Sequence, residues 1–187
     1  MIFSIGHGNR DFNDFVKLLH NYGIEYLIDV RSSPYSKMFP VYNRETLSNL
    51  LKQNNIIYLY LGDVLGGLPK DPSCHIEYSD KNKEEARKID YSKIEKKEFF
   101  QNGLERLKTA DAKGLKVTVM CSELHPEECH RSKLIGVALQ KSGIIVKHID
   151  KDGKLIDQIA VNVLINKGKN PINLWGEIDM TSKRKIK

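Results

Sequence analysis

Short apolar segments alternate with amphipathic segments about five times along this chain of 187 residues. The apolar segments have the length of strands, and they cover residues 2–5, 24–30, 56–61, 115–120 and 144–149. In most of the segments between them, apolar residues recur with the 3.6-residue period of a helix. A strand–helix alternation of this kind favours a mostly parallel sheet with helices on both faces. We therefore predict an α/β fold, a three-layer α/β/α sandwich with a mostly parallel, about five-stranded sheet.

The connections between these strands predict a single domain over residues 1–180. Residues 62–90 interrupt the alternation with Gly66-Gly67, two prolines and a densely charged stretch, so we expect a polar insert there. We expect one helix over 91–113 and another over 126–143. A turn at 152–153 should lead into a last helix near 155–165. We expect no hairpin between neighbouring strands. Residues 181–187, TSKRKIK, form a basic C-terminal tail, either a solvated terminus or a contact to a polyanion such as nucleic acid.

The composition is that of a soluble globular protein, with 40% hydrophobic residues, 29% charged residues and a net charge of +6. No run approaches the ~18 apolar residues of a membrane span, and the N-terminus MIFSIGHGNR lacks the features of a secretory signal. Three cysteines, an odd number, argue against a disulfide framework and fit a reducing compartment. We therefore predict a cytoplasmic protein without a membrane partner. The sequence indicates neither a particular cofactor nor an oligomeric state.

The strongest functional signal is the block MCSELHPEECHRSK at residues 120–133. Ligands of open α/β sheets bind outside the carboxyl ends of the strands. The strand at 115–120 delivers Cys121 to this edge, and the following loop carries Glu123. We expect Cys129, His130 and Arg131 in the first turn or so of the next helix. A helix N-terminus beside an arginine makes an anion site and lowers the pKa of a nearby thiol.

Several chemical interpretations of this block stay open. In the first, Cys121 or Cys129 is a thiolate nucleophile with His130 or Glu123 as acid or base. In the second, the two cysteines and His130, with His125 or Glu123 as a further ligand, bind a transition metal such as zinc, although their spacing is not that of a standard zinc motif. In the third, Glu123 and Arg131 hold a polar ligand. A small buried cysteine such as Cys121 can also be a packing residue without a chemical role.

Three other segments bring polar residues to the same predicted edge. After the first strand, IGHGNR at 5–10 supplies His7, Asn9 and Arg10, with glycines that allow close backbone approach. After the second strand, DVRSSPYSK at 29–37 supplies Asp29 and Arg31, which either pair with each other or orient an anionic ligand. After the third strand, LGDVLGGLP at 61–69 carries two glycines but matches no dinucleotide or P-loop motif.

Taken in order, these segments resemble the domain-of-unknown-function 488 family. The resemblance covers roughly residues 2–153 and rests on IGHGNR, YLIDVRSSPYS, the LGG after the third strand, the Asp90-Tyr91 pair, MCSELHPEECHR and VKHID. Gly8 stands where the family usually has serine. The resemblance implies a compact α/β/α domain with a shared polar site, but it supplies no established reaction. By position, the implied site residues are His7, Asn9, Arg10, Asp29, Arg31, Ser33, Cys121, Glu123, Cys129, His130 and Arg131.

From these residues we predict a hydrolase or transferase that acts on a phosphate-containing substrate, either a nucleotide or a nucleic acid. The catalytic candidates are Cys121, Glu123, His130 and His7, with Glu123 as general base or water-orienting carboxylate and His130 as its partner. The substrate-binding candidates are Asn9, Arg10, Asp29, Arg31, Ser33, Cys129 and Arg131. Two alternatives stay open, a non-catalytic module that binds nucleotides or nucleic acids, and a metal-binding protein that uses Cys121, Cys129 and His130.

Overall fold

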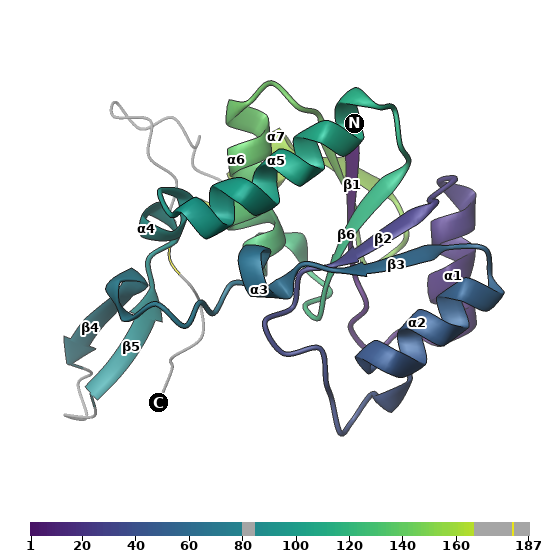
Figure 1. Ribbon diagram of the computed structural model, residues 1–187, viewed down its shortest axis with the longest axis horizontal. Helices are drawn as coiled ribbons and strands as arrows, with labels where there is room; N and C mark the ends of the chain where they lie inside the picture. The colour runs from purple at the N-terminus through teal and green to yellow at the C-terminus, as the bar shows by residue number, and fades with distance from the viewer. Residues whose placement is uncertain (80–84, 167–180, 182–187) are drawn as a thin grey trace.

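The computed structural model describes residues 1–79, 85–166 and 181, of which 77–79 and 85–87 are described by their backbone alone. The predicted α/β fold is confirmed, with helices on both faces of a central sheet (Figure 1). In the order β3-β2-β6-β1-β7-β8, the sheet contains β1 (Ile2–Gly6), β2 (Tyr26–Asp29), β3 (Ile57–Tyr60), β6 (Val117–Cys121), β7 (Val146–Ile149) and β8 (Leu155–Asp157). Apart from Thr181, the predicted basic tail lies outside the described residues.

The sheet is parallel except at one edge. Strands β1, β2, β3, β6 and β7 pair in parallel, whereas β8 pairs antiparallel with β7. The expectation that no hairpin joins neighbouring strands is wrong here. Gly153 takes a φ of 80°, and the N–H of Asp150 donates to the carbonyl of Lys154 at 2.9 Å, so the chain folds back onto β7. The last helix, α7 (Gln158–Ile165), therefore begins after a sixth strand.

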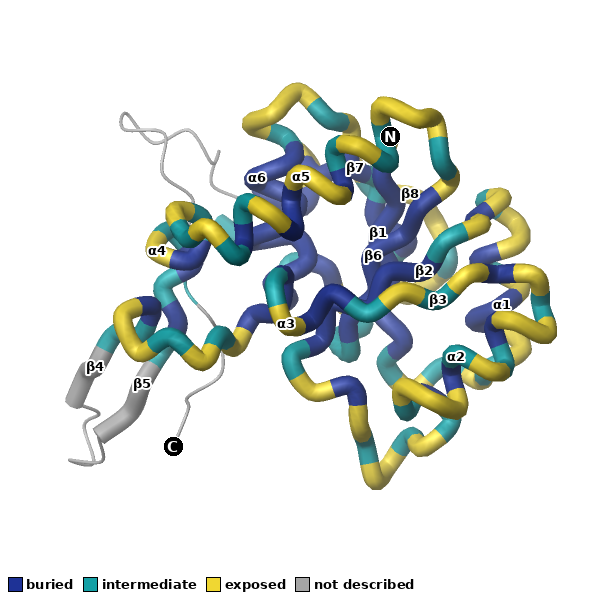
Figure 2. Tube along the Cα trace, in the orientation of Figure 1, coloured by how far each residue is buried: buried dark blue, intermediate teal, exposed yellow. Residues whose placement is uncertain are grey.

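Each face of the sheet carries its own hydrophobic cluster. Helices α1 (Phe12–Asn21) and α2 (Arg44–Gln53) cover one face, while α5 (Glu98–Ala112) and α6 (Val137–Lys141) cover the other. Ile2 and Phe3 belong to opposite clusters, because successive strand side chains point to opposite faces. The central strands β1 and β6 are buried, whereas β3 at the sheet edge is partly exposed (Figure 2).

The insert near residues 62–90 has secondary structure of its own. It contains α3 (Gly62–Leu65), the 3₁₀ turn η2 (Pro72–Cys74), and the antiparallel pair β4 (His75–Ser79) and β5 (Glu85–Ile89), which stands apart from the main sheet (Figure 1). The single helix predicted over 91–113 is wrong, because α4 (Tyr91–Glu95) ends before α5 begins. Between them Lys97 is extended, and its Nζ lies 2.7 Å from the Asp71 carboxylate of the insert.

The helix predicted from Pro126 is also interrupted. A 3₁₀ turn, η3 (Pro126–Glu128), is followed by Cys129 in an extended conformation with φ −116° and ψ 148°. The carbonyl of Cys129 then accepts the N–H groups of Ser132 at 3.2 Å and Lys133 at 3.1 Å, which starts a new helix. This helix is π-helical over η4 (Arg131–Gly136) and continues as α6. Cys129 therefore caps the helix instead of lying in its first turn. In the part of the chain described here, none of the helices has the length and apolarity to cross a membrane.

Candidate functional site

The carboxyl ends of three strands meet at one edge of the sheet. Strands β2, β6 and β1 are consecutive neighbours, with Gly6 opposite Cys121 and Asp29 opposite Met120. Residues 7–10, 30–33 and 122–131 follow these strand ends, so they start from the same edge. These three segments therefore start from one edge of the sheet, as we expected from the sequence.

A cavity of about 300 Å³ opens at this edge. Six of the predicted site residues line it, namely Arg31, Ser33, Cys121, Glu123, Cys129 and His130. The other predicted site residues do not line it, and these are His7, Asn9, Arg10, Asp29 and Arg131. The lining is completed by Ser32, Gly67, Leu68, Tyr91, Ser122 and Glu128. Sequence reasoning missed Glu128, although its place two residues before His130 in the 120–133 block was a usable signal.

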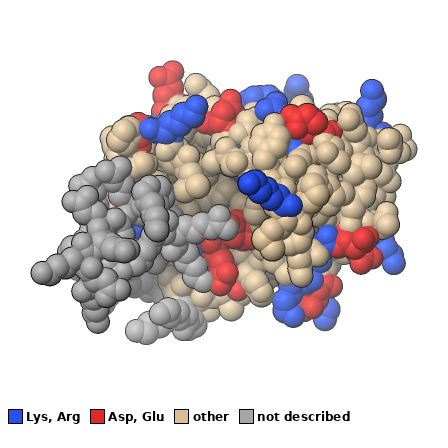
Figure 3. All heavy atoms as spheres, turned by 90° about the horizontal axis from the view of Figure 1, so that it is seen from below, with Lys and Arg blue, Asp and Glu red and all other residues tan. Residues whose placement is uncertain are grey.

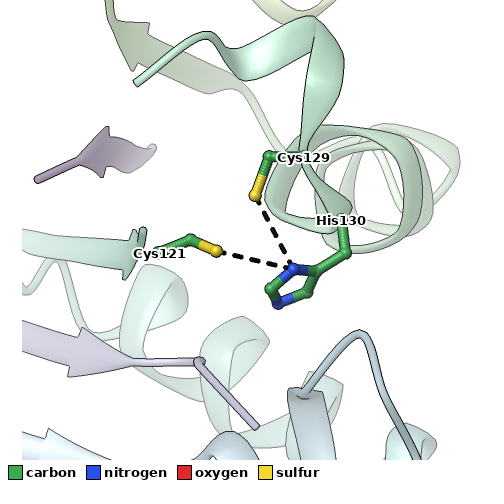
Figure 4. Close-up of side chains that lie close together, drawn as sticks. All are labelled: Cys121, Cys129 and His130. Atoms are coloured by element: carbon green, nitrogen blue, oxygen red, sulfur yellow. Dashed lines mark hydrogen bonds between the residues drawn. The ribbon is translucent and has the colours of Figure 1, made fainter. Parts of the chain in front are cut away.

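Cys121, Cys129 and His130 form the centre of the site (Figure 4). Both sulfur atoms lie 3.6 Å from Nδ1 of His130. The thiols of Cys121 and Cys129 also approach Oε2 of Glu123, at 2.8 Å and 3.3 Å. Cys121 comes from the end of β6, whereas Cys129 and His130 come from the start of the next helix (Figure 4). Two thiols thus share one imidazole nitrogen and one carboxylate oxygen.

The backbone sets the orientation of the His130 ring. Its Nε2 lies 3.0 Å from the carbonyl oxygen of Val30, and a carbonyl only accepts, so Nε2 carries a proton and Nδ1 faces the sulfur atoms. Gly67 lies against the ring, since a Cβ at this position would be 2.7 Å from Cγ of His130. The second glycine of the LGG segment therefore allows the insert to pack on His130.

The surroundings favour a thiolate on Cys129. Burial alone would raise the pKa of Cys129, but the neighbouring Cys121 thiol and the positive charges of His130 and Arg131 outweigh burial and bring this pKa well below its usual value. Burial raises the pKa of Cys121 well above its usual value, and the neighbouring Cys129 raises it further. The charge of Cys129 raises the pKa of His130 in spite of burial. The favoured state is a Cys129 thiolate beside a His130 imidazolium, with Cys121 as a neutral thiol.

Arg131 is completely buried and holds the loop that carries Glu123. Its guanidinium donates to the carbonyl oxygen of Glu123, to that of Leu124 at 3.0 Å and to the hydroxyl of Ser4 at 3.1 Å. Its backbone N–H donates to the Cys129 sulfur at 3.4 Å. Where the sequence suggested a substrate contact, the geometry makes Arg131 a support for the loop. A buried cation also stabilises an anion nearby, because the surrounding dielectric constant is low.

Arg31 is anchored from several sides and still reaches the cavity. Its Nε and Nη2 donate to the two carboxylate oxygens of Asp29 at 2.9 Å and 2.6 Å, and Nη2 also donates to the carbonyl of Tyr42 at 2.8 Å. Its Nη1 lies 3.3 Å from Nε2 of His7. The hydroxyl of Tyr58 donates to the same Asp29 carboxylate at 2.7 Å. Asp29 therefore positions Arg31 and is itself held by a tyrosine from the neighbouring strand.

His7 is a neutral partner of Arg31. Its Nδ1 lies 2.9 Å from the carbonyl of Gly8 and carries the proton, so Nε2 accepts from Arg31. Burial and the charge of Arg31 lower the pKa of His7 to about 4. The ring also stacks on Tyr42 with a centroid separation of 4.3 Å. Because both ring nitrogens have partners, His7 positions Arg31, which differs from the acid–base role that the sequence suggested.

The remaining predicted residues lie away from the cavity. Arg10 donates to the carbonyls of Gly6 at 3.3 Å, Lys151 at 3.1 Å and Asp150, and thus connects the end of β1 to the turn after β7. Asn9 is exposed. Of the three arginines among the predicted substrate-binding residues, Arg31 alone lines the cavity.

The surface charges give no indication of a nucleic-acid track on the face drawn in Figure 3. Acidic and basic side chains of the described residues are interspersed over this face. A polyanion is usually bound by a continuous basic patch or stripe. The described part of this face therefore does not support a polymeric nucleic-acid partner.

The chain matches the family model described as Domain of unknown function DUF488 over residues 11–138, which is more than half of its length. The matched range contains Asp29, Arg31 and the block at 120–133, whereas IGHGNR at 5–10 lies before its start. Neither the curated proteins nor the solved structures contain a match to the chain.

Proposed function

This chain belongs to the DUF488 family, and we propose that it is a hydrolase or transferase in which the Cys129 thiolate attacks a substrate bound in the cavity. The substrate carries an anionic group, for which phosphate is the leading candidate. His130 and Glu123 serve as acid and base, and Arg31 binds the anion. The observation that carries the proposal is that Cys129 lines the cavity, with its sulfur 3.6 Å from Nδ1 of His130 and 3.4 Å from the backbone nitrogen of Arg131.

The roles follow from which atoms meet. The Cys129 sulfur forms a bond to the electrophilic carbon or phosphorus of the substrate, and the leaving group takes the proton from Nδ1 of His130. Water, in a hydrolase, or an acceptor hydroxyl or amine, in a transferase, then displaces the sulfur. Glu123 is suited to accept the proton of this second nucleophile, because its carboxylate lies within 3.3 Å of the Cys129 sulfur and lines the same cavity.

Arg31 is the residue best suited to hold an anionic group. A guanidinium has five N–H donors, and four of those in Arg31 have the described partners Asp29 (twice), Tyr42 and His7. Nη1 has one further hydrogen, and the side chain lines the cavity. A single charge-assisted donor, with Ser33 as another lining residue of the cavity, fits a compact phosphate or carboxylate better than a long polyanion.

The thiolate is tested by alkylation with iodoacetamide across pH, followed by peptide mass spectrometry. We expect the rate at Cys129 to reach half its maximum well below about pH 8.5, the value for an unperturbed thiol. In His130→Gln the midpoint should rise, while Cys74→Ser, which changes a buried cysteine outside the cavity, should leave it unchanged. A wild-type midpoint equal to that of the urea-unfolded chain would contradict the proposal.

Catalysis is tested by a substrate screen with p-nitrophenyl phosphate, nucleoside phosphates and carboxylic esters. Cys129→Ser should abolish any turnover found, and Glu123→Gln should lower it by about a hundredfold, as expected for a lost general base. Arg31→Lys should mainly raise KM, because it weakens the binding of the anionic group. Turnover that survives Cys129→Ser would exclude Cys129 as the nucleophile.

A metal centre is the second candidate function, and one specific observation favours it. The ligand atoms of Cys121, Cys129 and His130 all lie within 4.8 Å of one another. Tetrahedral zinc, with bonds of about 2.3 Å to sulfur and about 2.0 Å to nitrogen, separates these atoms by about 3.6 Å. Both sulfur–nitrogen distances here are 3.6 Å, and the second ring nitrogen donates to the Val30 carbonyl, as metal-bound histidines commonly do.

Elemental analysis of the purified chain separates the two candidates. One equivalent of zinc or another transition metal that is lost in Cys121→Ser and Cys129→Ser would favour the metal centre. A metal-free chain with a low alkylation midpoint would favour the thiolate. The non-catalytic module that binds nucleotides or nucleic acids, predicted from the arginines at the sheet edge and the basic tail, stays a prediction. The tail, apart from Thr181, lies outside the described residues.

A further inference from the structure

The nucleophilic mechanism leaves Cys121 without a role, although it lies next to Cys129. The two sulfur atoms are within 4.8 Å of each other, and both residues line the cavity. Both thiols also approach the same oxygen of Glu123, at 2.8 Å and 3.3 Å. A second thiol within reach of a reactive one is the arrangement in which a disulfide forms after oxidation.

We propose that Cys121 is the resolving thiol of Cys129, so that hydrogen peroxide converts the pair reversibly into a Cys121–Cys129 disulfide and switches the site off. This inference rests on the proposed function, because it uses Cys129 as the reactive sulfur. It adds a modification site and a form of regulation to that function.

The chemistry balances in two steps. In the first, the Cys129 thiolate attacks one oxygen of hydrogen peroxide, the O–O bond breaks, and the departing hydroxide takes a proton to leave as water, which gives Cys129 sulfenic acid. In the second, the sulfur of Cys121 loses its proton and attacks the Cys129 sulfur, the S–O bond breaks, and a second water leaves. The two thiols lose two electrons and peroxide gains them. A small dithiol reverses the reaction by thiol–disulfide exchange.

The groups needed for the second step surround the sulfur atoms. Oε2 of Glu123 lies 2.8 Å from the Cys121 sulfur and can accept its proton. Nδ1 of His130 lies 3.6 Å from both sulfur atoms and can protonate the departing oxygen. Cys129 is the extended residue between η3 and the following helix, and hydrogen bonds of its backbone N–H and carbonyl to these two elements hold it in place. The sulfur atoms need to approach only from less than 4.8 Å to bonding distance.

Cys74 provides an internal control. It is completely buried in η2 and lies outside both the cavity lining and the cluster of Cys121, Cys129 and His130. Peroxide at low concentration should leave Cys74 reduced, and Cys74→Ser should oxidise as the wild type does.

The test is treatment of the full-length chain with one equivalent of hydrogen peroxide, followed by intact and peptide mass spectrometry without reducing agent. The wild type should lose the mass of two hydrogen atoms, yield a linked peptide of Cys121 and Cys129, and recover its original mass with dithiothreitol. Cys121→Ser should instead gain one oxygen atom at Cys129, which dimedone traps. Cys129→Ser should give neither product.

A different result would overturn the resolving role. If the wild type and Cys121→Ser accumulate the same oxygen adducts on Cys129 without a disulfide, Cys121 does not resolve. If peroxide oxidises Cys121 in Cys129→Ser as fast as it oxidises Cys129 in the wild type, the sulfur that reacts with peroxide does not have to be that of Cys129, and the assigned roles are refuted. Alkylation of the untreated protein separates the failure of this proposal from the failure of the proposed function. If the alkylation midpoint of Cys129 is low but peroxide forms no disulfide, the resolving role of Cys121 alone is refuted. If the alkylation midpoint is that of an ordinary thiol, the Cys129 thiolate itself is refuted.

Discussion

Replacement of Gly67 by alanine should disturb the site chemistry through a single contact. A Cβ at this position would lie 2.7 Å from Cγ, 2.8 Å from Cβ and 2.9 Å from Nδ1 of His130, whereas ordinary contact begins at 3.4 Å. The ring or the loop must therefore move by about 0.7 Å, the difference between 3.4 Å and 2.7 Å. Such a shift of the ring changes the distance from its Nε2 to the carbonyl oxygen of Val30, now 3.0 Å, and both distances of 3.6 Å to the sulfur atoms.

The magnitude follows from the known cost of an added methyl group in a packed interior, about 1–3 kcal/mol. For a chain of this size each kilocalorie lowers Tm by about 2–4 °C, so we expect a loss of about 2–12 °C by thermal unfolding. Because His130 contributes to the low pKa of Cys129, the alkylation midpoint of Cys129 should also rise in Gly67→Ala.

Gly114→Ala is the matched control for this prediction. Gly114 has a φ of 71°, and a Cβ added there would have no neighbouring atom within 4 Å, so alanine adds backbone strain of about 1–2 kcal/mol without touching the site. It should lower Tm and leave the Cys129 midpoint unchanged. If Gly67→Ala behaves like Gly114→Ala, with reduced Tm but an unchanged midpoint, the ring position does not control the thiol, and the reasoning is refuted.

Three further changes test the supporting network. Arg131→Met leaves two partly buried loop carbonyls without their donor and should lower the free energy of unfolding by about 1–3 kcal/mol in urea titrations. An unchanged free energy of unfolding would contradict this prediction. His7 and His148 are buried with pKa values lowered to about 4, so the unfolded chain binds more protons than the folded chain below pH 6.5. Stability should therefore fall by about 3 kcal/mol per histidine between pH 6.5 and pH 4, and His148→Gln should remove about half of this dependence; a flat profile would contradict it. Tyr58→Phe removes the hydroxyl that donates to Asp29 at 2.7 Å and should cost about 1–3 kcal/mol in the same titration, and an unchanged value would mean that water replaces the hydroxyl.

Local patterns in the sequence were sufficient for most of the fold. Strand positions follow from short apolar runs. Helix α1 begins after Asp11, a residue type that commonly caps helices, and the Asp11 side chain accepts the N–H of Asn13 at 2.8 Å. These signals act within a few residues, so they can be read without knowledge of the rest of the chain. The same locality explains the error after β7. A turn at Gly153 is compatible with a hairpin or with a helix start, and the pairing of β8 with the preceding strand β7 decides between them.

The candidate site likewise combines features that the sequence determined with features that depend on the fold. The sequence alone determined that Cys121, Glu123, Cys129 and His130 would follow one strand end, because they belong to one short block. It did not determine that both sulfur atoms would lie 3.6 Å from one nitrogen, since that distance depends on the extended backbone conformation of Cys129 between two helical segments.

The tertiary structure alone decided the roles of the arginines. In the sequence, Arg10, Arg31 and Arg131 look alike, each following a strand and each able to hold an anion. In the fold, Arg10 binds carbonyls about 140 residues away, Arg131 binds loop carbonyls and a hydroxyl 127 residues away, and Arg31 alone lines the cavity. A long charged side chain takes the partners that surround it in space. Asp29 is a local partner of Arg31, but partners such as Asp150 and Ser4 come from distant segments, and no local pattern can specify those.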